Sequence, residues 1–193
     1  MTNFSMMNDP STVRLREGAR ADLARHFAAL EAEDRRLRFG SALSDAALGE
    51  YVNRIDFARD GVFAMHDEHL RVVAAVHVAL AGATAELGLS VLPGWRGRGL
   101  GDALLRRAVT WLRNRGVLAV YVHCITENAA MLHLARKNGM RIVYSGSESD
   151  GRLELGPPTP ATFAQEWLDD QRGLAMQAWR HNARWMQSLF AAP

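Results

Sequence analysis

The sequence predicts an α/β (mixed α+β) fold, in which a central mixed β-sheet is flanked by helices and followed by a C-terminal helical extension. Three β-rich segments follow one another closely within residues 61–92, which is typical of antiparallel hairpins. Helical and β-rich segments then alternate over residues 102–155. The stiff stretch Pro157–Pro160 precedes a long helical tail. We therefore expect a disordered tail over 1–10, one domain over 11–156 and an extension over 157–193.

The first part of the domain predicts one short strand and two helices. Alternating side chains over Thr12–Arg16 indicate the strand. Apolar residues at helical spacing predict one continuous helix over Ala21–Leu37. Ser44 is a favourable N-cap, so a second helix is expected to run from Asp45 to Ile55.

The middle of the chain predicts three antiparallel strands. We expect them over Gly61–His66, Leu70–Leu80 and Ala85–Leu92, joined by polar or glycine-containing turns. His66, Asp67, Glu68 and His69 lie together in the first of these turns, where they are better explained as polar side chains in contact with water than as metal ligands.

The second half of the domain predicts two helices and three strands. The helices are expected over Asp102–Arg115 and Asn128–Asn138, each followed by a glycine that favours helix termination. A β-branched and aromatic run predicts a central strand over Val117–Ile125. A hairpin over Arg141–Ser145 and Arg152–Leu155 completes the domain.

The extension predicts one long helix over Ala161–Phe190, bent at Gly173. Aromatic and aliphatic side chains form a broad apolar band along it, which favours a buried interface. Three interpretations are open, in order of preference: packing on the domain's own sheet, a homodimer interface, and membrane-surface binding. The basic residues Arg172, Arg180, His181 and Arg184 suit the third, but neighbouring acidic residues offset them.

Composition narrows the functional class. The 193 residues are 48% hydrophobic and 23% charged, as in ordinary globular domains. A net charge of +2 is too small for a nucleic-acid surface, and no apolar run is long enough for an integral membrane span. The N-terminal ten residues lack a signal-peptide core, and Cys124 is the single cysteine, so we expect a cytoplasmic protein without disulfides.

The stretch Val91–Gly101, which reads Val-Leu-Pro-Gly-Trp-Arg-Gly-Arg-Gly-Leu-Gly, is the most informative motif. Glycines let a backbone approach a ligand closely, and the N-terminus of the following helix favours negative charge. The motif lacks the lysine and hydroxyl residue of a triphosphate-binding loop, and it does not fit a dinucleotide fingerprint. It therefore predicts a pyrophosphate site, to which Arg96 and Arg98 add charge.

This loop resembles the coenzyme A loop of the GNAT superfamily of N-acyltransferases, which often reads V-x-P-x-x-R-G-x-G-x-G. The predicted element order over about 12–155 also resembles the GNAT fold, whereas the helical tail lies outside the resemblance. The resemblance implies acetyl-CoA as co-substrate and no metal. The residues expected to bind it are Leu89, Val91, Arg96, Gly97, Arg98, Gly99, Leu100, Gly101 and Asn128.

A second segment, from Asn128 to Met140, resembles the GNAT pattern N-x-x-A-x-x-L-Y-x-x-x-G-F. The resemblance implies that Asn128 bonds the pantetheine arm, although an ordinary helix-start role explains it equally well. The tyrosine that protonates the departing thiolate in many members is replaced here by Ala135, which cannot donate a proton. Tyr144 is a candidate substitute, and no spacing separates it from Tyr121, His123, His133 or Cys124.

Glu86 is the candidate general base, because some family members carry a catalytic glutamate at this place. We expect partial burial to raise its pKa, so that it accepts the proton of the amine through water. A structural glutamate is the slightly preferred alternative. His77, in the preceding strand, is interpreted as a packed residue more readily than as a proton relay.

A cationic stretch borders the expected acceptor site. Arg35, Arg36 and Arg38 suit either an acidic ligand or a solvated helix end, and Phe39 and Tyr51 are candidates to line the site.

The resulting hypothesis is an N-acyltransferase that transfers acetyl from acetyl-CoA to a primary amine by direct attack in a ternary complex. The amine acceptor is of unknown identity, and a homodimer through the C-terminal helix is a possible assembly. The alternative is a non-catalytic acyl-CoA-binding regulatory module, which the loss of the tyrosine at Ala135 favours. A third hypothesis is that the protein binds phosphate ligands without preference for coenzyme A.

Overall fold

The computed structural model describes the backbone of residues 11–190 and the side chains of residues 11–179 and 182. The predicted disordered tail over 1–10 lies outside the described residues, as do the side chains of Arg180, His181 and Arg184 on which the membrane-surface interpretation rested. Within the described residues, no helix is both long enough and apolar enough to span a membrane.

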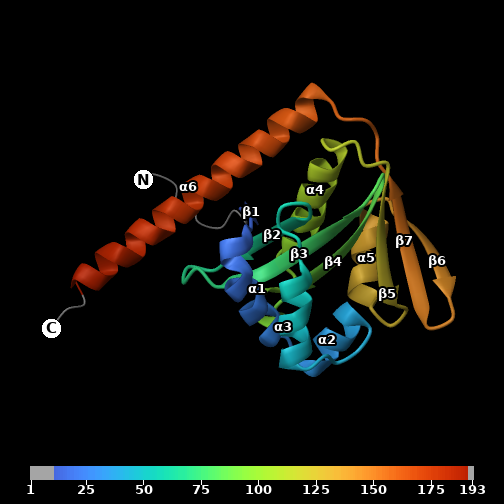
Figure 1. The fold of residues 1–193 in the computed structure, drawn as a ribbon, viewed down its shortest axis with the longest axis horizontal. Coiled ribbons are helices and arrows are strands. Elements are labelled where there is room, and N and C mark those ends of the chain that lie inside the picture. Colours follow the sequence, from blue (N-terminus) through green and yellow to red (C-terminus); the bar gives the residue numbers. More distant parts are fainter. Residues whose placement is uncertain (1–10, 191–193) are drawn as a thin grey trace.

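Seven strands form one mixed sheet in the order β1-β2-β3-β4-β5-β7-β6 (Figure 1). All neighbouring pairs are antiparallel except β4 and β5, which are parallel. The predicted fold class is therefore confirmed. The strands are β1 Val13–Arg14, β2 Gly61–His66, β3 Val72–Ala81, β4 Thr84–Val91, β5 Ala119–Ile125, β6 Arg141–Ser145 and β7 Glu148–Glu154.

Helices cover both faces of the sheet and extend the chain at its end. They are α1 Arg20–Ala28, α2 Ala32–Phe39, α3 Asp45–Arg54, α4 Leu100–Arg113, α5 Ala129–Lys137 and α6 Pro160–Phe190, with 3₁₀ turns at Glu17–Ala19 and Pro93–Trp95. The side chain of Ser44 accepts from the backbone N–H of Ala47, as its N-cap prediction requires. Gly116 and Gly139 follow α4 and α5 with positive φ angles.

The single helix predicted over 21–37 is wrong, because the chain turns between α1 and α2. Leu30 is buried in this turn, and its backbone carbonyl accepts from Nε of Arg35 at 2.9 Å. The same guanidinium donates to the carbonyl oxygens of Ala28 and Leu43. The side chain of Arg35 thus pairs the backbone carbonyl groups that the break leaves without helical partners. The turn lets α2 pack against β4 and β5, while α1 packs against β3.

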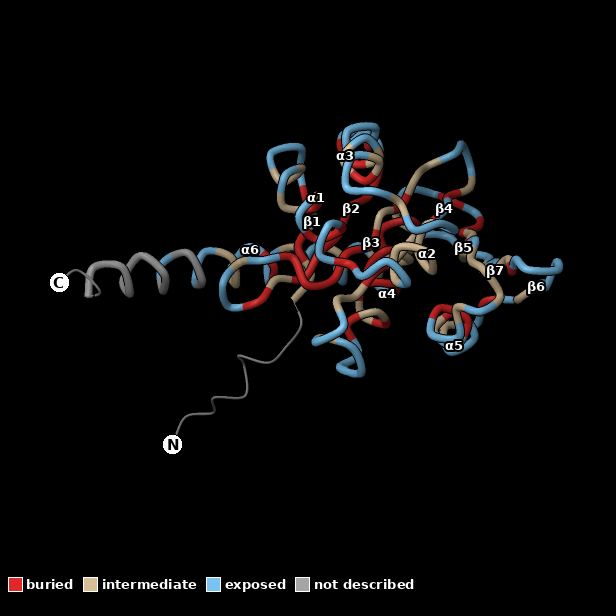
Figure 2. Tube along the Cα trace, turned by 90° about the horizontal axis from the view of Figure 1, so that it is seen from below, coloured by how far each residue is buried: buried red, intermediate tan, exposed pale blue. Residues whose placement is uncertain are grey.

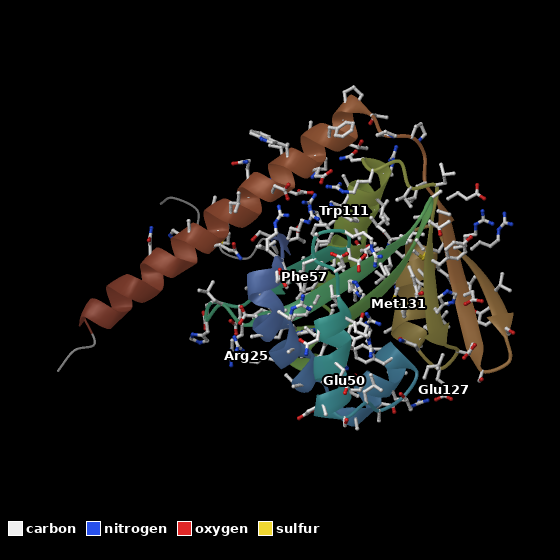
Figure 3. The ribbon with its side chains drawn as sticks, viewed as in Figure 1. Arg25, Glu50, Phe57, Trp111, Glu127 and Met131 are labelled. Atoms are coloured by element: carbon white, nitrogen blue, oxygen red, sulfur yellow. The ribbon has the colours of Figure 1, made fainter. Side chains whose placement is uncertain are left out.

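Two apolar clusters lie on opposite faces of the sheet. One joins the sheet to α4 and α5 and includes Trp111, whose ring meets that of Phe63 edge-on at 5.8 Å between centroids (Figure 3). The other joins the sheet to α1 and α3 and includes Leu23, Phe27 and Leu48. Burial is concentrated in the strands and in the helix faces turned toward them (Figure 2). Hydrophobic burial on both faces therefore fixes the sheet that carries the site.

The first half of α6 packs on the domain, and the rest extends beyond it (Figure 1). The side chain of Asn114, the C-cap residue of α4, donates to the carbonyl oxygen of Thr162 at 3.0 Å, and the buried Arg107 pairs with Asp170. The helix does not bend at Gly173 as predicted. Instead, Gly173 is buried against β1, where an added Cβ would lie 2.6 Å from the carbonyl oxygen of Thr12.

This close contact predicts opposite effects for alanine at two helical glycines. Gly173→Ala should destabilise the fold by about 1–3 kcal/mol, because the methyl group overlaps backbone. Gly49→Ala in α3 meets nothing within 4 Å and should stabilise by about 0.4–1 kcal/mol. Urea unfolding of both variants measures the difference. Equal stability of the two variants would contradict the docking of α6 on β1.

Candidate functional site

The strands β4 and β5 pair only at their first residues. Three register pairs join them, the last between Glu86 and Tyr121. Beyond that point β5 continues to pair with β7 as far as Ile125, while no described strand takes its place beside β4. The two strands therefore diverge, and β4 from Leu87 to Val91 presents one backbone edge without a strand partner.

The glycine-rich loop lies at the end of this free edge. Gly97 and Gly99 have φ angles of 73° and 78°, a region that favours glycine. Helix α4 begins at Leu100, two residues earlier than predicted, and no side chain caps it at Gly99. The first N–H groups of α4 have no intrahelical partners, so they and the helix dipole are available to an anion.

Arg96 and Arg98 are both held beside the loop. Arg96 forms an ion pair with Asp34 of α2 at 2.5 Å, and its Nε donates to the carbonyl oxygen of Val91 at 3.2 Å. Arg98 donates to the carbonyl oxygen of Gly94 at 3.0 Å, and its guanidinium lies 4.7 Å from the ring centroid of Trp95. Both residues are exposed, and the charge of Arg98, which forms no ion pair among the described residues, adds to the field at the N-terminus of α4.

Several sequence-predicted residues converge where the loop meets β4. A Cβ added at Gly101 would lie 3.5 Å from the side chain of Leu89 and 4.0 Å from that of Val91. Leu100 beside it is buried in the α4 core. The structure thus brings the free edge of β4 and the start of α4 together, although these groups lie about ten residues apart in the chain.

Asp102 ties α4 to α5 and was not singled out by sequence reasoning. Its carboxylate accepts from Nζ of Lys137 at 3.0 Å and from Nδ2 of Asn138 at 2.9 Å, and it also pairs with Arg106. Burial acts to raise the pKa of Asp102, but these hydrogen bonds outweigh burial and lower it. The carboxylate stays ionised, and the cations Lys137 and Arg106 compensate its negative charge. It therefore does not cancel the positive potential at the N-terminus of α4. Lys137 is the one lysine of the sequence, and this was the feature that could have drawn attention to its contact with Asp102.

Asn128 has structural partners for both ends of its side-chain amide. Its Oδ1 accepts from the backbone N–H of Met131 at 3.0 Å, and its Nδ2 donates to the carbonyl oxygen of Leu37 at 3.0 Å. It therefore caps α5 and fastens that helix to α2. Ala135, about two helical turns further on, is buried in the core and offers no proton donor there.

Tyr144 lies away from the other predicted residues. It sits on β6 at the outer edge of the sheet, is 52% exposed, and its hydroxyl bonds Arg136. The structure does not bring it to the divergence of β4 and β5. Of the other candidates for proton donation, His123 pairs with Asp150, and burial raises the pKa of the Cys124 thiol.

Glu86 lies on the sheet face opposite α4, but it is exposed rather than partly buried as expected. Burial alternates along β4, so Glu86, Gly88 and Ser90 share one face. Across the strand pair, Gly88 is the register partner of His77, which places Glu86 diagonally from that histidine. Glu86 and His77 therefore face the same space above β3 and β4.

His77 belongs to a chain of polar side chains that sequence spacing does not reveal. Its Nε2 lies 3.3 Å from Oδ2 of the buried Asp60, and its Nδ1 lies 2.7 Å from the hydroxyl of Tyr51. The Tyr51 oxygen in turn accepts from a terminal nitrogen of Arg38 at 3.3 Å. Because an ionised carboxylate only accepts hydrogen bonds, we assign the ring proton of His77 to Nε2 and an acceptor role to Nδ1.

The protonation states along this chain follow from burial and hydrogen bonding. Burial acts to raise the pKa of Asp60, but hydrogen bonds from Arg59 and His77 outweigh it and lower that pKa. Burial lowers the pKa of His77, against the opposing effect of Asp60. At neutral pH the chain therefore holds an ionised carboxylate and a neutral imidazole, which can accept a proton.

His26 fastens α1 to the strand that carries the site. Its ring nitrogens contact Oγ of Ser90 on β4 at 2.8 Å and the carbonyl oxygen of Val72 at 3.0 Å. It also lines a cavity of about 560 Å³ that opens between α1 and the β2–β3 turn and reaches Trp95. Burial lowers the pKa of His26 to about 4. Within the described residues, no group of histidine, cysteine and carboxylate side chains is placed to hold a metal ion.

Comparison with known proteins adds a family assignment to this geometry. The sequence model of the acetyltransferase (GNAT) family matches residues 26–140. Streptothricin acetyltransferase of Streptomyces lavendulae is 31% identical over 80 residues, which are 37% of this chain and 42% of that protein. The chain thus spans less than half the length of this curated relative.

Solved structures show the same fold. The GNAT domain of S. lividans PAT superposes with a TM-score of 0.64 at 17% identity, covering 75% of this chain and 89% of that one. The yncA structure from Salmonella typhimurium with its cofactor acetyl-CoA gives a TM-score of 0.60 at 15% identity, covering 78% and 96%. At such identities the likeness concerns the fold alone.

The buried His26 predicts a loss of stability in acid. The folded protein keeps this residue neutral down to about pH 4, whereas the unfolded chain takes up its proton near pH 6.5. Between these values the unfolded state binds more protons, so stability falls as pH falls, by at most about 3 kcal/mol from this group. Urea unfolding at pH 7 and pH 4.5 should show a smaller acid loss in His26→Gln than in the native protein. The exposed His133→Gln is the control, and an equal acid loss in both variants would contradict the assignment.

Proposed function

The chain belongs to the acetyltransferase (GNAT) family, and on this premise we propose that it transfers the acetyl group of acetyl-CoA to a primary amine. Membership makes acetyl-CoA the co-substrate. We further propose that the amine attacks directly while both substrates are bound, without an acylated enzyme.

One observation carries the proposal: the uncapped N-terminus of α4 opens beside the free backbone edge of β4. A pyrophosphate fits the first feature, because the N–H groups from Gly97 to Gly101 and the helix dipole favour an anion. The pantetheine arm, which carries amide groups, fits the second, because amides can take the place of the missing strand partner. The residues present therefore fit acetyl-CoA.

Backbone groups of β4 then have a role in the chemistry. Bound acetyl-CoA would supply an acetyl thioester, whose carbon–sulfur bond is exchanged for a carbon–nitrogen bond. We propose that a backbone N–H near Leu89 or Val91 donates to the thioester oxygen and stabilises the negative charge that develops there. The Asn128 side chain already caps α5, so its proposed contribution is to hold α5 in place against α2.

The attacking amine must lose a proton, and two groups are placed to accept it. Glu86 is exposed on the acceptor face, and a water molecule can connect it to an ammonium group. Tyr51 offers a second route, because its hydroxyl proton is directed at the neutral His77, which Asp60 supports. We keep Glu86 as the proposed base, because it is open to solvent and needs no movement of a buried proton.

The departing thiolate takes its proton from water in this proposal. Ala135 stands where many family members carry a tyrosine, and Tyr144 lies at the far edge of the sheet. The same observation favours the second candidate function, a module that binds acyl-CoA without turnover and signals through α6. Assembly through the exposed side of α6 and residence in the cytoplasm stay predictions.

The acceptor is a separate question. The relative named for streptothricin makes an antibiotic amine one reasonable candidate, but it matches little more than a third of this chain. A first panel should contain streptothricin, free amino acids and peptides with a free N-terminus or a lysine. Family membership leaves the choice open, because acceptor-facing loops vary independently of the fold.

The test of the proposed function is a calorimetric titration with acetyl-CoA, with ATP and NADH as controls, followed by measurement of amine-dependent coenzyme A release. Selective binding with release supports the acetyltransferase. Selective binding without release for any amine supports the regulatory module. A folded protein that binds none of the three would overturn both.

The loop geometry predicts a charge effect on affinity. Arg98→Glu should weaken acetyl-CoA binding at least tenfold, because one charge-assisted hydrogen bond contributes about 1.5–3 kcal/mol and the new carboxylate also repels phosphate. Arg141→Glu makes the same change in net charge on the exposed start of β6 and should leave affinity unchanged. Calorimetry at fixed ionic strength measures both. An equal loss in the two variants would mean that net charge, and not the loop, sets the affinity.

The two candidate proton acceptors, Glu86 and the Tyr51–His77 route, can be distinguished because each predicts that a different variant loses activity. If Glu86 is the base, Glu86→Gln should lower kcat by about 10²–10⁴-fold while acetyl-CoA affinity stays the same. His77→Gln should then retain most turnover. The exposed Glu148→Gln on β7 is the matched control. The reverse pattern, with loss in His77→Gln and Tyr51→Phe alone, would transfer the role of base to the Tyr51–His77 route.

A further inference from the structure

We propose that Arg38 and Glu86 together recognise an acceptor that carries a carboxylate as well as its amine, as an amino acid does. The inference rests on the proposed function, because it assigns the acceptor class of that same site.

The side chain of Arg38, a residue of α2, lies against β4, the strand that carries the proposed chemistry. Helix α2 packs against β4 and β5, and Arg38 stands in its last turn. The guanidinium occupies the space where Gly88 lacks a side chain, so that any Cβ there would overlap it. A glycine within a strand weakens the strand and often marks a close approach by another group. Here the group that approaches is a cation.

Aromatic rings hold this guanidinium in place. It lies 4.8 Å from the ring centroid of Phe39 and 6.0 Å from that of Tyr51, and one terminal nitrogen donates to the Tyr51 hydroxyl. A guanidinium held against rings keeps its planar edge available for a two-pronged contact with a carboxylate. The rings therefore fix the position of the charge without neutralising it.

The charge of Arg38 is left without a counter-ion, unlike those of its neighbours on α2. Arg35 pairs with Asp45 at 2.7 Å, and Arg36 pairs with Glu127 at 2.6 Å. Glu127, which is labelled in Figure 3, lies between β5 and α5 in the chain. Among the side chains that the structure describes, Arg38 forms no ion pair, and its Nε is buried without a hydrogen-bond partner. A partly buried cation of this kind favours an anionic ligand.

Glu86 supplies the opposite charge at a suitable separation. It lies two residues before Gly88 on the same face of β4, so the positions are roughly 7 Å apart along the strand. An ammonium group contacting Glu86 and a carboxylate contacting Arg38 can belong to one small molecule. The pair of charges thus fits a zwitterion that lies along β4, with its amine at Glu86 and its carboxylate at Arg38.

The experiment compares an amino acid with its own carboxamide as acceptors. The two share the side chain and the amine, but the carboxamide has lost the negative charge. Its amine is also less basic, so more of it is neutral, and without recognition of the carboxylate the carboxamide should react faster. We expect kcat/KM for the acid to exceed that for the carboxamide by at least about tenfold, the size of one charge-assisted hydrogen bond.

Variants identify the residue responsible. Arg38→Met should reduce the acid-to-carboxamide ratio by about tenfold or more, and Arg38→Lys should restore part of it. Gly88→Ala displaces the guanidinium while keeping the charge and should also lower the ratio. Arg36→Met on the same helix is the matched control and should keep the native ratio. Thermal melting and acetyl-CoA affinity of each variant report whether the fold and the cofactor loop are intact.

The outcomes separate this inference from the proposed function. Transfer to amines with no preference for the acid, or with a preference that survives Arg38→Met, overturns the inference and leaves the acetyltransferase standing. A preference for phosphorylated amines over carboxylated ones also overturns it. If no amine is acetylated, calorimetry with the amino acid and the coenzyme A-loaded protein decides. Binding that Arg38→Met abolishes supports recognition of the zwitterion, and absence of binding rejects it.

Discussion

The early end of pairing between β4 and β5 is the constraint on which the rest of the site depends. After Glu86 the backbone of β4 has no neighbour on one side, so its polar groups need solvent or a ligand. Beside this gap, β5 stays paired with β7 along its whole length, and Asp102 joins α4 to the end of α5. A single carboxylate with three nitrogen partners therefore links the helix that begins beside the free edge to the helix that follows β5.

The two faces of β4 have different roles. On one face, Leu87 belongs to the apolar core beneath α4, which holds the strand and the glycine loop in a fixed relation. On the other face, glycine at position 88 leaves room for a charged side chain from α2. A polar chain from Asp60 to Arg38 crosses this second face. Its hydrogen bonds lie in a partly buried setting, where each is stronger than it would be in water, while Nε of Arg38 stays without a partner.

Helix α6 belongs to the domain for electrostatic as well as steric reasons. Arg107 is buried in α4, lies 4.8 Å from the ring centroid of Phe63, and has Asp170 of α6 as its ion-pair partner. Without α6 that buried cation would lose its carboxylate, which is costly. On the same helix, Trp167 and Leu174 are exposed, so α6 combines a docked side with an apolar side open to solvent.

The sequence by itself determined the features that depend on neighbouring residues. The strands β2 to β4, the cap at Ser44 and the left-handed backbone of Gly97 and Gly99 follow from period, capping chemistry and backbone freedom, all of which act within a few residues. Only the tertiary structure decided the break between α1 and α2, the contact of Arg38 with Gly88, and the distant position of Tyr144. The break lets α1 and α2 pack on different strands, and Arg38 meets a glycine that lies tens of positions along the chain. No local pattern encodes which face of which strand a side chain will meet.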